Sequence, residues 1–192
     1  MDIASEIENY LEAHKRAVDL LDKDWIAAFM NAMIEALEEE KDIYIFGNGG
    51  SAAAASHFTV DIGKGASLGA KKRFRMHCLT DNVPVMTAYA NDLSYEDIFV
   101  EPLRNLLRQG DLVIAISGSG NSENVIRAVR YAKEMNAKVV GICGYSGGKL
   151  KDLSDIPLHL PVDDMQLAED MQALITHLAL KVLCKYQSID CC

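Results

Sequence analysis

The sequence predicts an α/β fold in which a five-stranded parallel sheet lies between two layers of helices. Short apolar runs rich in β-branched residues alternate with longer segments of helical pattern, as in successive βαβ units. The runs are apolar at consecutive positions, which is typical of strands buried on both faces. The expected strands span residues 43–46, 76–79, 112–116, 139–143 and 156–160. Right-handed crossovers then place helices on both faces and give a three-layer α-β-α sandwich.

Helices are expected between the strands and at both ends of the chain. Those between and after the strands span residues 51–61, 84–91, 100–108, 124–135 and 165–185. Two further helices, at residues 3–22 and about 25–40, precede the first strand and carry apolar residues at helical spacing. Because the sheet does not require this pair, residues 1–40 either pack against another subunit or fold back within the chain. No linker or repeat interrupts the sequence, so we expect one domain over residues 1–192 with its core at residues 43–187.

Composition and charge argue against several classes of function. The formal charge of −9 disfavours direct nucleic-acid binding, which requires a basic surface to neutralise phosphates. No stretch reaches the roughly 20 apolar residues of a membrane-spanning helix, and the first residues do not resemble a signal peptide. The five cysteines are scattered without zinc-ligand spacing, so we expect reduced thiols and a cytoplasmic protein. A basic segment at residues 64–75 either attracts a small anion or forms a solvated loop.

A glycine-rich loop follows the first expected strand. It reads Gly47-Asn48-Gly49-Gly50-Ser51 and leads into a helix that begins with four alanines. Glycines allow a sharp turn and a close approach of the backbone to a ligand, and the start of the helix offers N–H groups and a positive dipole end. The loop is suited to an anion, although glycine-rich turns also occur without a ligand.

A second loop of this kind follows the third expected strand. It reads Ser117-Gly118-Ser119-Gly120-Asn121-Ser122, and a helix begins directly after it. Hydroxyl groups and glycine-flanked amides at the start of a helix suit a phosphate. Neither loop has the spacing of a Walker A motif or of a dinucleotide-binding fingerprint. Both stand at the carboxyl ends of parallel strands, where open α/β sheets bind ligands, so anion binding is favoured over plain turns.

At these residues the sequence resembles the sugar isomerase (SIS) domain family, and within it the phosphoheptose isomerases. The matching segments are GNGGSAAAASHF, AYANDLSYEDIF, ISGSGNSENVIRAV and GYSGGKLKDLSD, which together span about residues 43–180. The resemblance implies the SIS fold and the isomerisation of sedoheptulose 7-phosphate, or of a related phosphorylated ketose, in heptose biosynthesis. It also implies a homotetramer whose sites are built from more than one subunit.

The resemblance implies substrate contacts at both loops and at an Asn-Asp pair. The serine loop, here Ser117, Gly118, Ser119 and Ser122, would hold the phosphate. The loop Asn48–Ser51 would contact the substrate, as would Asn91 and Asp92.

His57 and Asp61 lie four residues apart on the helix after the first loop, and therefore on one face of it. This spacing suits a general base or two metal ligands, and it also occurs in ordinary surface pairs. The adjoining loop favours a functional role. The resemblance implies a histidine and a glutamate here, the glutamate acting both as catalytic base and as zinc ligand. Asp61 keeps the carboxylate on an arm one methylene shorter, and a displacement of about 1 Å can lower a rate by ~10²-fold.

The last helix carries Gln172, which matches a family glutamine that contacts substrate and metal. A second catalytic histidine of the family lies eight residues further on, where this chain has Leu180. His177 is the nearest histidine, but it lies roughly 140° around the helix from Gln172, against about 80° for position 180. His177 could replace the family histidine only if this helix were rotated or if His177 entered the site of another subunit. On an otherwise apolar helix, we expect His177 to be a satisfied core or interface residue. The implied zinc ligands are His57, Asp61 and Gln172.

Four acidic residues surround the start of this last helix. Asp163 and Asp164 are expected to cap it, and Glu169 and Asp170 are expected on its solvated side.

Two functions remain open at this point. The first is an aldose–ketose isomerase that acts on a sugar phosphate, with Asp61 as base and His57 beside it. The second is a non-catalytic member of the fold that senses a sugar phosphate or binds a partner protein. Leu180 and the shortened Asp61 favour the second function, whereas the two loops, His57 and Gln172 favour the first.

Overall fold

The structure is a computed structural model and describes residues 1–190. Five strands form one sheet, β1 (Asp42–Gly47), β2 (Arg75–Cys78), β3 (Leu112–Ser117), β4 (Lys138–Cys143) and β5 (Ile156–His159). Their order is β2-β1-β3-β4-β5, and every pair is parallel. The predicted α/β fold with a five-stranded parallel sheet is confirmed.

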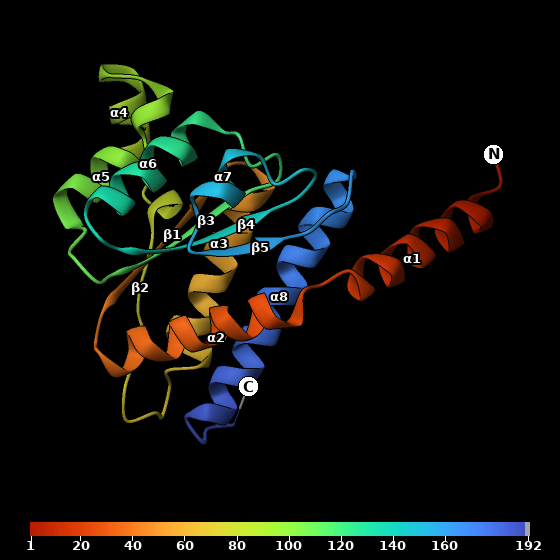
Figure 1. Cartoon of the computed structure of the whole chain (residues 1–192), viewed down its shortest axis with the longest axis horizontal. Coiled ribbons are helices and arrows are strands. Elements are labelled where there is room, and N and C mark those ends of the chain that lie inside the picture. The colour runs from red at the N-terminus through yellow and green to blue at the C-terminus, as the bar shows by residue number, and fades with distance from the viewer. Residues whose placement is uncertain (191–192) are drawn as a thin grey trace.

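Eight α-helices surround the sheet within the described residues (Figure 1). They are α1 (Ile3–Asp19), α2 (Lys23–Glu38), α3 (Gly50–Val60), α4 (Val83–Asp92), α5 (Val100–Leu106), α6 (Glu123–Glu134), α7 (Gly148–Leu153) and α8 (Met165–Tyr186). A π-helical turn, Asp61–Gly65, continues α3, and short 3₁₀ turns occur at Leu79–Asp81 and Tyr95–Asp97. Helix α7 is absent from the sequence-based prediction because it is short and begins at two glycines with positive φ.

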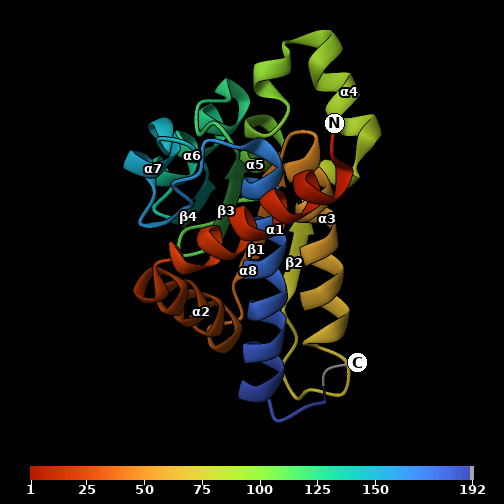
Figure 2. The ribbon, with the colours of Figure 1, turned by 90° about the vertical axis from the view of Figure 1, so that its right-hand side faces the viewer.

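Two apolar cores lie on opposite faces of the sheet. Ile43 and Ile45 of β1 pack with α2, α3 and α8, whereas Tyr44 and Phe46 pack with α5, α6 and α7. This division follows from the alternation of side chains along a strand. Helix α8 runs alongside α3 on the first face (Figure 2). This pair carries His57 on α3 and His177 on α8.

The first helix extends away from the body of the molecule (Figure 1), and Ala17 is its buried residue. The Tyr10 hydroxyl of α1 donates a hydrogen bond of 2.5 Å to Asp170 Oδ2 on α8, and this carboxylate raises the pKa of Tyr10 to about 12. The Asp170 side chain is 43 % exposed, so it lies on the solvated side of α8 as expected, although α1 contacts it there. Asp164 does cap α8, since its side chain accepts a hydrogen bond from the N–H of Leu167.

The thiols within the described residues agree with a reduced protein. Cys78 and Cys143 form no disulfide. Burial raises the pKa of the Cys143 thiol to about 12, so this thiol stays protonated and unreactive at neutral pH. Cys191 and Cys192 lie outside the described residues. Over residues 1–190, none of the helices has the length and apolar character needed to cross a membrane.

Candidate functional site

The two loops meet at the point where the strand order reverses. From β1 the chain moves outward to β2 and then returns to β3 on the other side of β1. Gly47 at the end of β1 is in register with Ile116 at the end of β3, so the loops that follow start side by side. Open α/β sheets bind ligands in the crevice at such a switch point. The topology therefore brings together two segments that are about 70 residues apart in sequence.

A pair of asparagines joins the two loops. Asn48 and Asn124 exchange reciprocal amide hydrogen bonds, each 2.9 Å long. The Tyr95 hydroxyl donates a further bond of 2.9 Å to Asn48 Oδ1. Asn124 is 2 % exposed, so this link is a buried, satisfied contact between the first loop and the start of α6. Sequence reasoning missed Asn124 and Tyr95, because only the topology places them opposite Asn48.

A cavity of about 210 Å³ lies beside the first loop. Asn48, Gly49, Thr87 and Tyr95 contribute to its lining, so helix α4 forms its far wall. Gly49 has φ +56 and stands at the N-cap of α3, a conformation that favours glycine. The predicted contacts Asn91 and Asp92 sit exposed at the end of α4, where the Asn91 amide donates to Asp92 Oδ1 at 2.8 Å.

The serine loop presents its hydroxyl groups around the start of α6. Ser117 Oγ and Ser122 Oγ lie 3.2 Å apart. Ser122 is the N-cap of α6, yet its side chain makes no capping bond to the first turn. Its hydroxyl therefore faces Ser117 rather than the helix, and it can hydrogen-bond a ligand. Ser119 is exposed, and its Oγ accepts a hydrogen bond of 3.2 Å from the Asn121 N–H.

Helix α7 and the turn before it support the serine loop from behind. Gly120 has φ +66, and a Cβ built there would lie 1.9 Å from the carbonyl oxygen of Gly147. The Gly120 carbonyl accepts a hydrogen bond of 2.9 Å from the Leu150 N–H, and the Gly118 carbonyl accepts one of 2.8 Å from Gly144. Position 120 therefore requires glycine, and the close backbone contact holds the loop in one shape.

A carboxylate occupies the start of α3. A Cβ built at Gly50 would lie 2.2 Å from Glu169 Oε1, so the Glu169 side chain rests against this first turn. The expectation that Glu169 lies on a solvated side is wrong: it is half-buried where a negative charge is stabilised by the helix dipole. A second anion at the same place would be repelled. The serine loop is therefore better suited to a phosphate than the first loop is. The first loop is better suited to an uncharged part of a ligand.

Gln172 lies fully buried behind the first loop. Its Oε1 accepts a hydrogen bond of 3.4 Å from Ser51 Oγ, whereas its Nε2 has no hydrogen-bond partner among the described residues. An amide donor left unpaired in a buried position costs free energy unless a ligand or a water satisfies it. The substrate contact expected of Gln172 stays a prediction.

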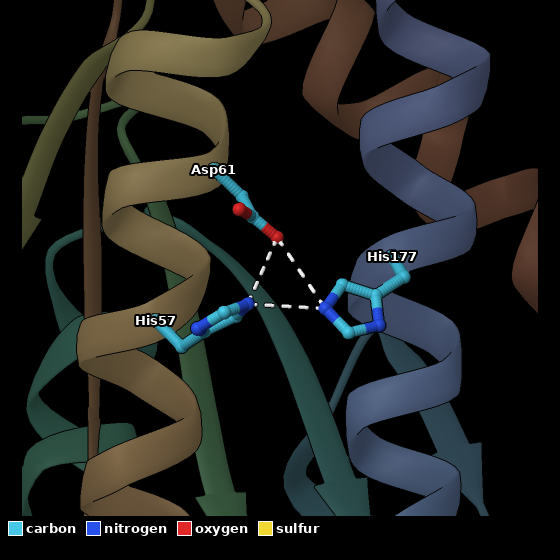
Figure 3. A group of neighbouring side chains, drawn as sticks. All are labelled: His57, Asp61 and His177. Carbon is cyan, nitrogen blue, oxygen red and sulfur yellow. Dashed lines mark hydrogen bonds and ion pairs between the residues drawn. The ribbon is translucent and has the colours of Figure 1, made fainter. Parts of the chain in front are cut away.

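His57, Asp61 and His177 come together between α3 and α8 (Figure 3). His57 Nε2 lies 3.3 Å from Asp61 Oδ2 and 3.0 Å from His177 Nε2, and His177 Nε2 lies 3.8 Å from Asp61 Oδ2. The predicted shared face of His57 and Asp61 is confirmed. His177 is not a core residue, because its side chain is 57 % exposed and meets the other two. Its expected role at an interface stays a prediction. The angle between Gln172 and His177 around α8 does not predict this contact, because His177 meets His57 on α3 rather than Gln172.

Asp61 opens the π-helical turn that follows α3. The Ala66 N–H donates to the Asp61 carbonyl at 2.9 Å, which is the i→i+5 bond of a π-turn, a feature frequent at functional sites. Asp61 Oδ2 is buried and has no hydrogen bond of good geometry among the described residues, although both rings lie nearby. At the end of the turn, a Cβ at Gly65 would lie 2.9 Å from Leu180 Cδ1, so Leu180 packs against Gly65 through an apolar contact.

The sequence comparisons agree with this geometry. The SIS domain family matches residues 7–144, which is well over half of the chain. The chain belongs to the SIS domain family. It is 36 % identical over 176 residues to a phosphoheptose isomerase from Helicobacter pylori (strain P12), a match that covers 92 % of this chain and 91 % of the relative.

Solved structures of the SIS family show the same architecture. A phosphoheptose isomerase from Francisella tularensis superposes with a TM-score of 0.89 at 28 % identity, covering 96 % of this chain and all of the other. A phosphoheptose isomerase from Neisseria gonorrhoeae gives 0.83 at 29 % identity, covering 94 % and 96 %. The match therefore includes the two leading helices as well as the sheet, and the predicted SIS fold is confirmed.

Proposed function

We propose that this SIS protein is an aldose–ketose isomerase that acts on sedoheptulose 7-phosphate or a related phosphorylated ketose. The observation that carries the proposal is the pairing of a serine loop shaped for phosphate with the His57–Asp61–His177 cluster. Similarity to phosphoheptose isomerases over more than nine-tenths of the chain supports the choice of substrate.

The chemistry requires a base, because the reaction moves a proton between two adjacent carbons. Ser117, Ser119 and Ser122 bind the phosphate and fix one end of the sugar. Asp61 takes the proton from the carbinol carbon and returns it to the neighbouring carbon. The proton of the carbinol hydroxyl passes to the neighbouring carbonyl oxygen, and His57 beside Asp61 can carry it.

Other polar groups would orient the sugar between these two ends. Asn48 and Gln172 lie at the first loop, and the unpaired Gln172 Nε2 can donate a hydrogen bond to a substrate oxygen. Asn91 and Asp92 bind substrate hydroxyls in this proposal, once the bond between them opens.

A zinc ion fits the donor atoms at the cluster. Two imidazole nitrogens and a carboxylate oxygen are ligands that zinc prefers, and all three atoms lie within 4.8 Å of one another. The buried Asp61 Oδ2 has no hydrogen bond among the described residues, and it is the kind of atom that a cation would satisfy. When bound, zinc supplies a Lewis acid that polarises a substrate carbonyl or hydroxyl oxygen. The ion would be held by His57, Asp61 and His177, whose donor atoms meet. The resemblance implies Gln172 as a further ligand.

A non-catalytic sugar-phosphate sensor is the second candidate. The observation that favours it is Leu180, which packs against Gly65 and offers no polar atom. A sensor would bind the sugar phosphate through the same loops without converting it, so binding alone does not separate the two functions.

Turnover of sedoheptulose 7-phosphate separates them. We expect the wild-type protein, assayed with and without added zinc, to convert the ketose to the aldose phosphate, because the base and the phosphate loop are both present. Conversion can be followed by NMR of the sugar. Binding of the sugar phosphate with no conversion in either condition would contradict the isomerase and favour the sensor.

We also propose that the chain self-associates through residues 1–40, as a homotetramer with sites at subunit interfaces. Helix α1 exposes a stripe of apolar side chains, Ile3, Ile7 and Leu11, each more than half exposed. Changing Ile7 and Leu11 together to aspartate should lower the oligomeric state in sizing chromatography with light scattering. A wild-type protein that is already a stable monomer would contradict this assembly.

The free thiols bear on the cellular location. We propose a cytoplasmic protein, because Cys78 and Cys143 are free cysteines, as expected of a protein kept in a reducing compartment.

A further inference from the structure

We infer that Tyr95 is a positioning residue of the sugar site, which acts by holding the Asn48 amide in one orientation. In that orientation Asn48 offers a ligand only an N–H donor, so it recognises a sugar oxygen that accepts a hydrogen bond. The inference deepens the proposed function and rests on it, because it requires a sugar phosphate to bind beside the first loop.

The orientation of the two asparagine amides follows from one backbone donor. The Val125 N–H belongs to the first turn of α6, where N–H groups have no acceptor within the helix. It lies 2.9 Å from one terminal atom of the Asn124 side chain, which must therefore be the oxygen Oδ1. Asn124 Nδ2 then faces Asn48 at 2.9 Å, so the atom of Asn48 that it meets must be the acceptor Oδ1. A group that can only donate thus fixes the direction of both bonds.

Tyr95 completes the hydrogen bonding of Asn48 Oδ1. An amide oxygen accepts two hydrogen bonds, and an amide nitrogen donates two. Asn48 Oδ1 accepts one from Asn124 Nδ2 and one from the Tyr95 hydroxyl, both 2.9 Å long. Asn48 Nδ2 donates one to Asn124 Oδ1, also at 2.9 Å, and its second N–H has no acceptor among the described residues. Asn48 can therefore donate to a ligand, but it has no lone pair left with which to accept from one.

This donor belongs to the wall of the cavity beside the first loop. Asn48 is half-buried, and it lines the cavity of about 210 Å³ together with Tyr95. Because the serine loop suits the phosphate better, the group that meets Asn48 is an uncharged sugar oxygen, either the ketose carbonyl or a hydroxyl that accepts. Asn124 stands directly after the serine loop, so the same bonds tie the sugar end of the site to its phosphate end.

The backbone around Tyr95 is itself anchored to α6. Tyr95 opens the 3₁₀ turn that ends at Asp97. Asp97 Oδ1 accepts a hydrogen bond of 2.9 Å from Arg127 Nη1 on α6, and its Oδ2 accepts one of 2.7 Å from the Ser94 hydroxyl. The turn that carries the tyrosine and the helix that carries Asn124 are therefore held together, which keeps both donors in place around Asn48 Oδ1.

A surface tyrosine that simply satisfies its own hydroxyl is the competing explanation. The Tyr95 side chain is 56 % exposed, so water could hydrogen-bond this hydroxyl without cost. The bond to Asn48 is therefore not required by burial of the tyrosine. It is required to fill the second lone pair of Asn48 Oδ1, which would otherwise compete for a hydroxyl hydrogen of the sugar.

A double-mutant cycle tests whether Tyr95 acts through Asn48. Calorimetry measures the affinity of the full-length protein for sedoheptulose 7-phosphate. We expect Tyr95→Phe to weaken binding by about 3- to 10-fold, the effect of one ordinary hydrogen bond. In the Asn48→Ala background the same change should alter the affinity by no more than about twofold, because the tyrosine has lost the group that it positions.

Two controls exclude a general loss of structure. Inorganic phosphate needs only the serine loop, so it should bind Tyr95→Phe as it binds wild type. Tyr186→Phe removes an exposed hydroxyl that bonds to Glu38 instead, and it should leave the affinity for the sugar phosphate unchanged. Circular dichroism checks that each variant is folded.

The outcomes separate this inference from the proposed function. An equal loss from Tyr95→Phe in both backgrounds, or no loss in either, would overturn the positioning role. No binding of the sugar phosphate by wild type would overturn both the positioning role and the choice of substrate. If the loss disappears in the Asn48→Ala background while wild type binds the sugar without converting it, the positioning role stands and the isomerase proposal fails.

Discussion

Asp61→Asn should lower turnover of sedoheptulose 7-phosphate by about 10²- to 10⁴-fold, the usual contribution of a general base. The amide keeps the size of the side chain but cannot accept the proton at the substrate carbon. Asp61 is also the carboxylate shared by His57 and His177, so the variant should lose affinity for zinc when titrated with the ion by calorimetry. The sugar phosphate should still bind, because the serine loop lies on a different element.

The matched control is Asp152→Asn, which changes an exposed acid on α7. We expect it to retain turnover and zinc binding. Initial rates and calorimetric binding constants for both variants provide the comparison. If Asp61→Asn retained the wild-type rate, the base would have to be another residue.

Removing two hydroxyls of the serine loop should weaken binding of the sugar phosphate by about 10²- to 10⁴-fold. A hydrogen bond to a charged group contributes about 1.5–3 kcal/mol, so the double variant Ser119→Ala with Ser122→Ala loses roughly 3–6 kcal/mol. Stability should change little, because the Ser122 side chain makes no capping bond to α6 and Ser119 is exposed.

Two comparisons make this prediction specific to phosphate. Ser5→Ala on α1 removes an exposed hydroxyl far along the chain from the loop and should leave the affinity unchanged. Unphosphorylated sedoheptulose should bind the double variant and wild type about equally weakly. An unchanged affinity of the double variant for the phosphorylated sugar would show that the phosphate binds elsewhere.

The sheet and its ligand edge could be predicted from the sequence, because strands buried on both faces leave continuous apolar runs. The runs around Ile43, Val113 and Val139 each became a strand, and the loop after β1 and the loop after β3 met at the switch point. Helix α7 could not be predicted, because six residues starting at glycines carry no helical period. Its role is visible only in the contact between Gly120 and Gly147.

The cluster shows where sequence reasoning fails. The spacing of His57 and Asp61 is a local property of one helix, and it was sufficient to place them on one face. His177 belongs to another helix, and its meeting with His57 depends on how α8 packs along α3. Similarly, Glu169 was expected in solvent because nothing in the sequence shows that Gly50 leaves room for its carboxylate. Such contacts follow from tertiary packing rather than from periodicity.

The central claim is that one sugar phosphate reaches from the serine loop to Asp61. A crystal structure of the Asp61→Asn variant soaked with sedoheptulose 7-phosphate tests it most directly, because the slow variant preserves the substrate. We predict the phosphate among Ser117, Ser119 and Ser122. The carbinol end should lie within hydrogen-bond reach, about 2.6–3.2 Å, of the side chain at position 61 of the same chain or of a partner copy. A phosphate bound away from the serine loop, or a carbinol end directed away from position 61, would contradict the account.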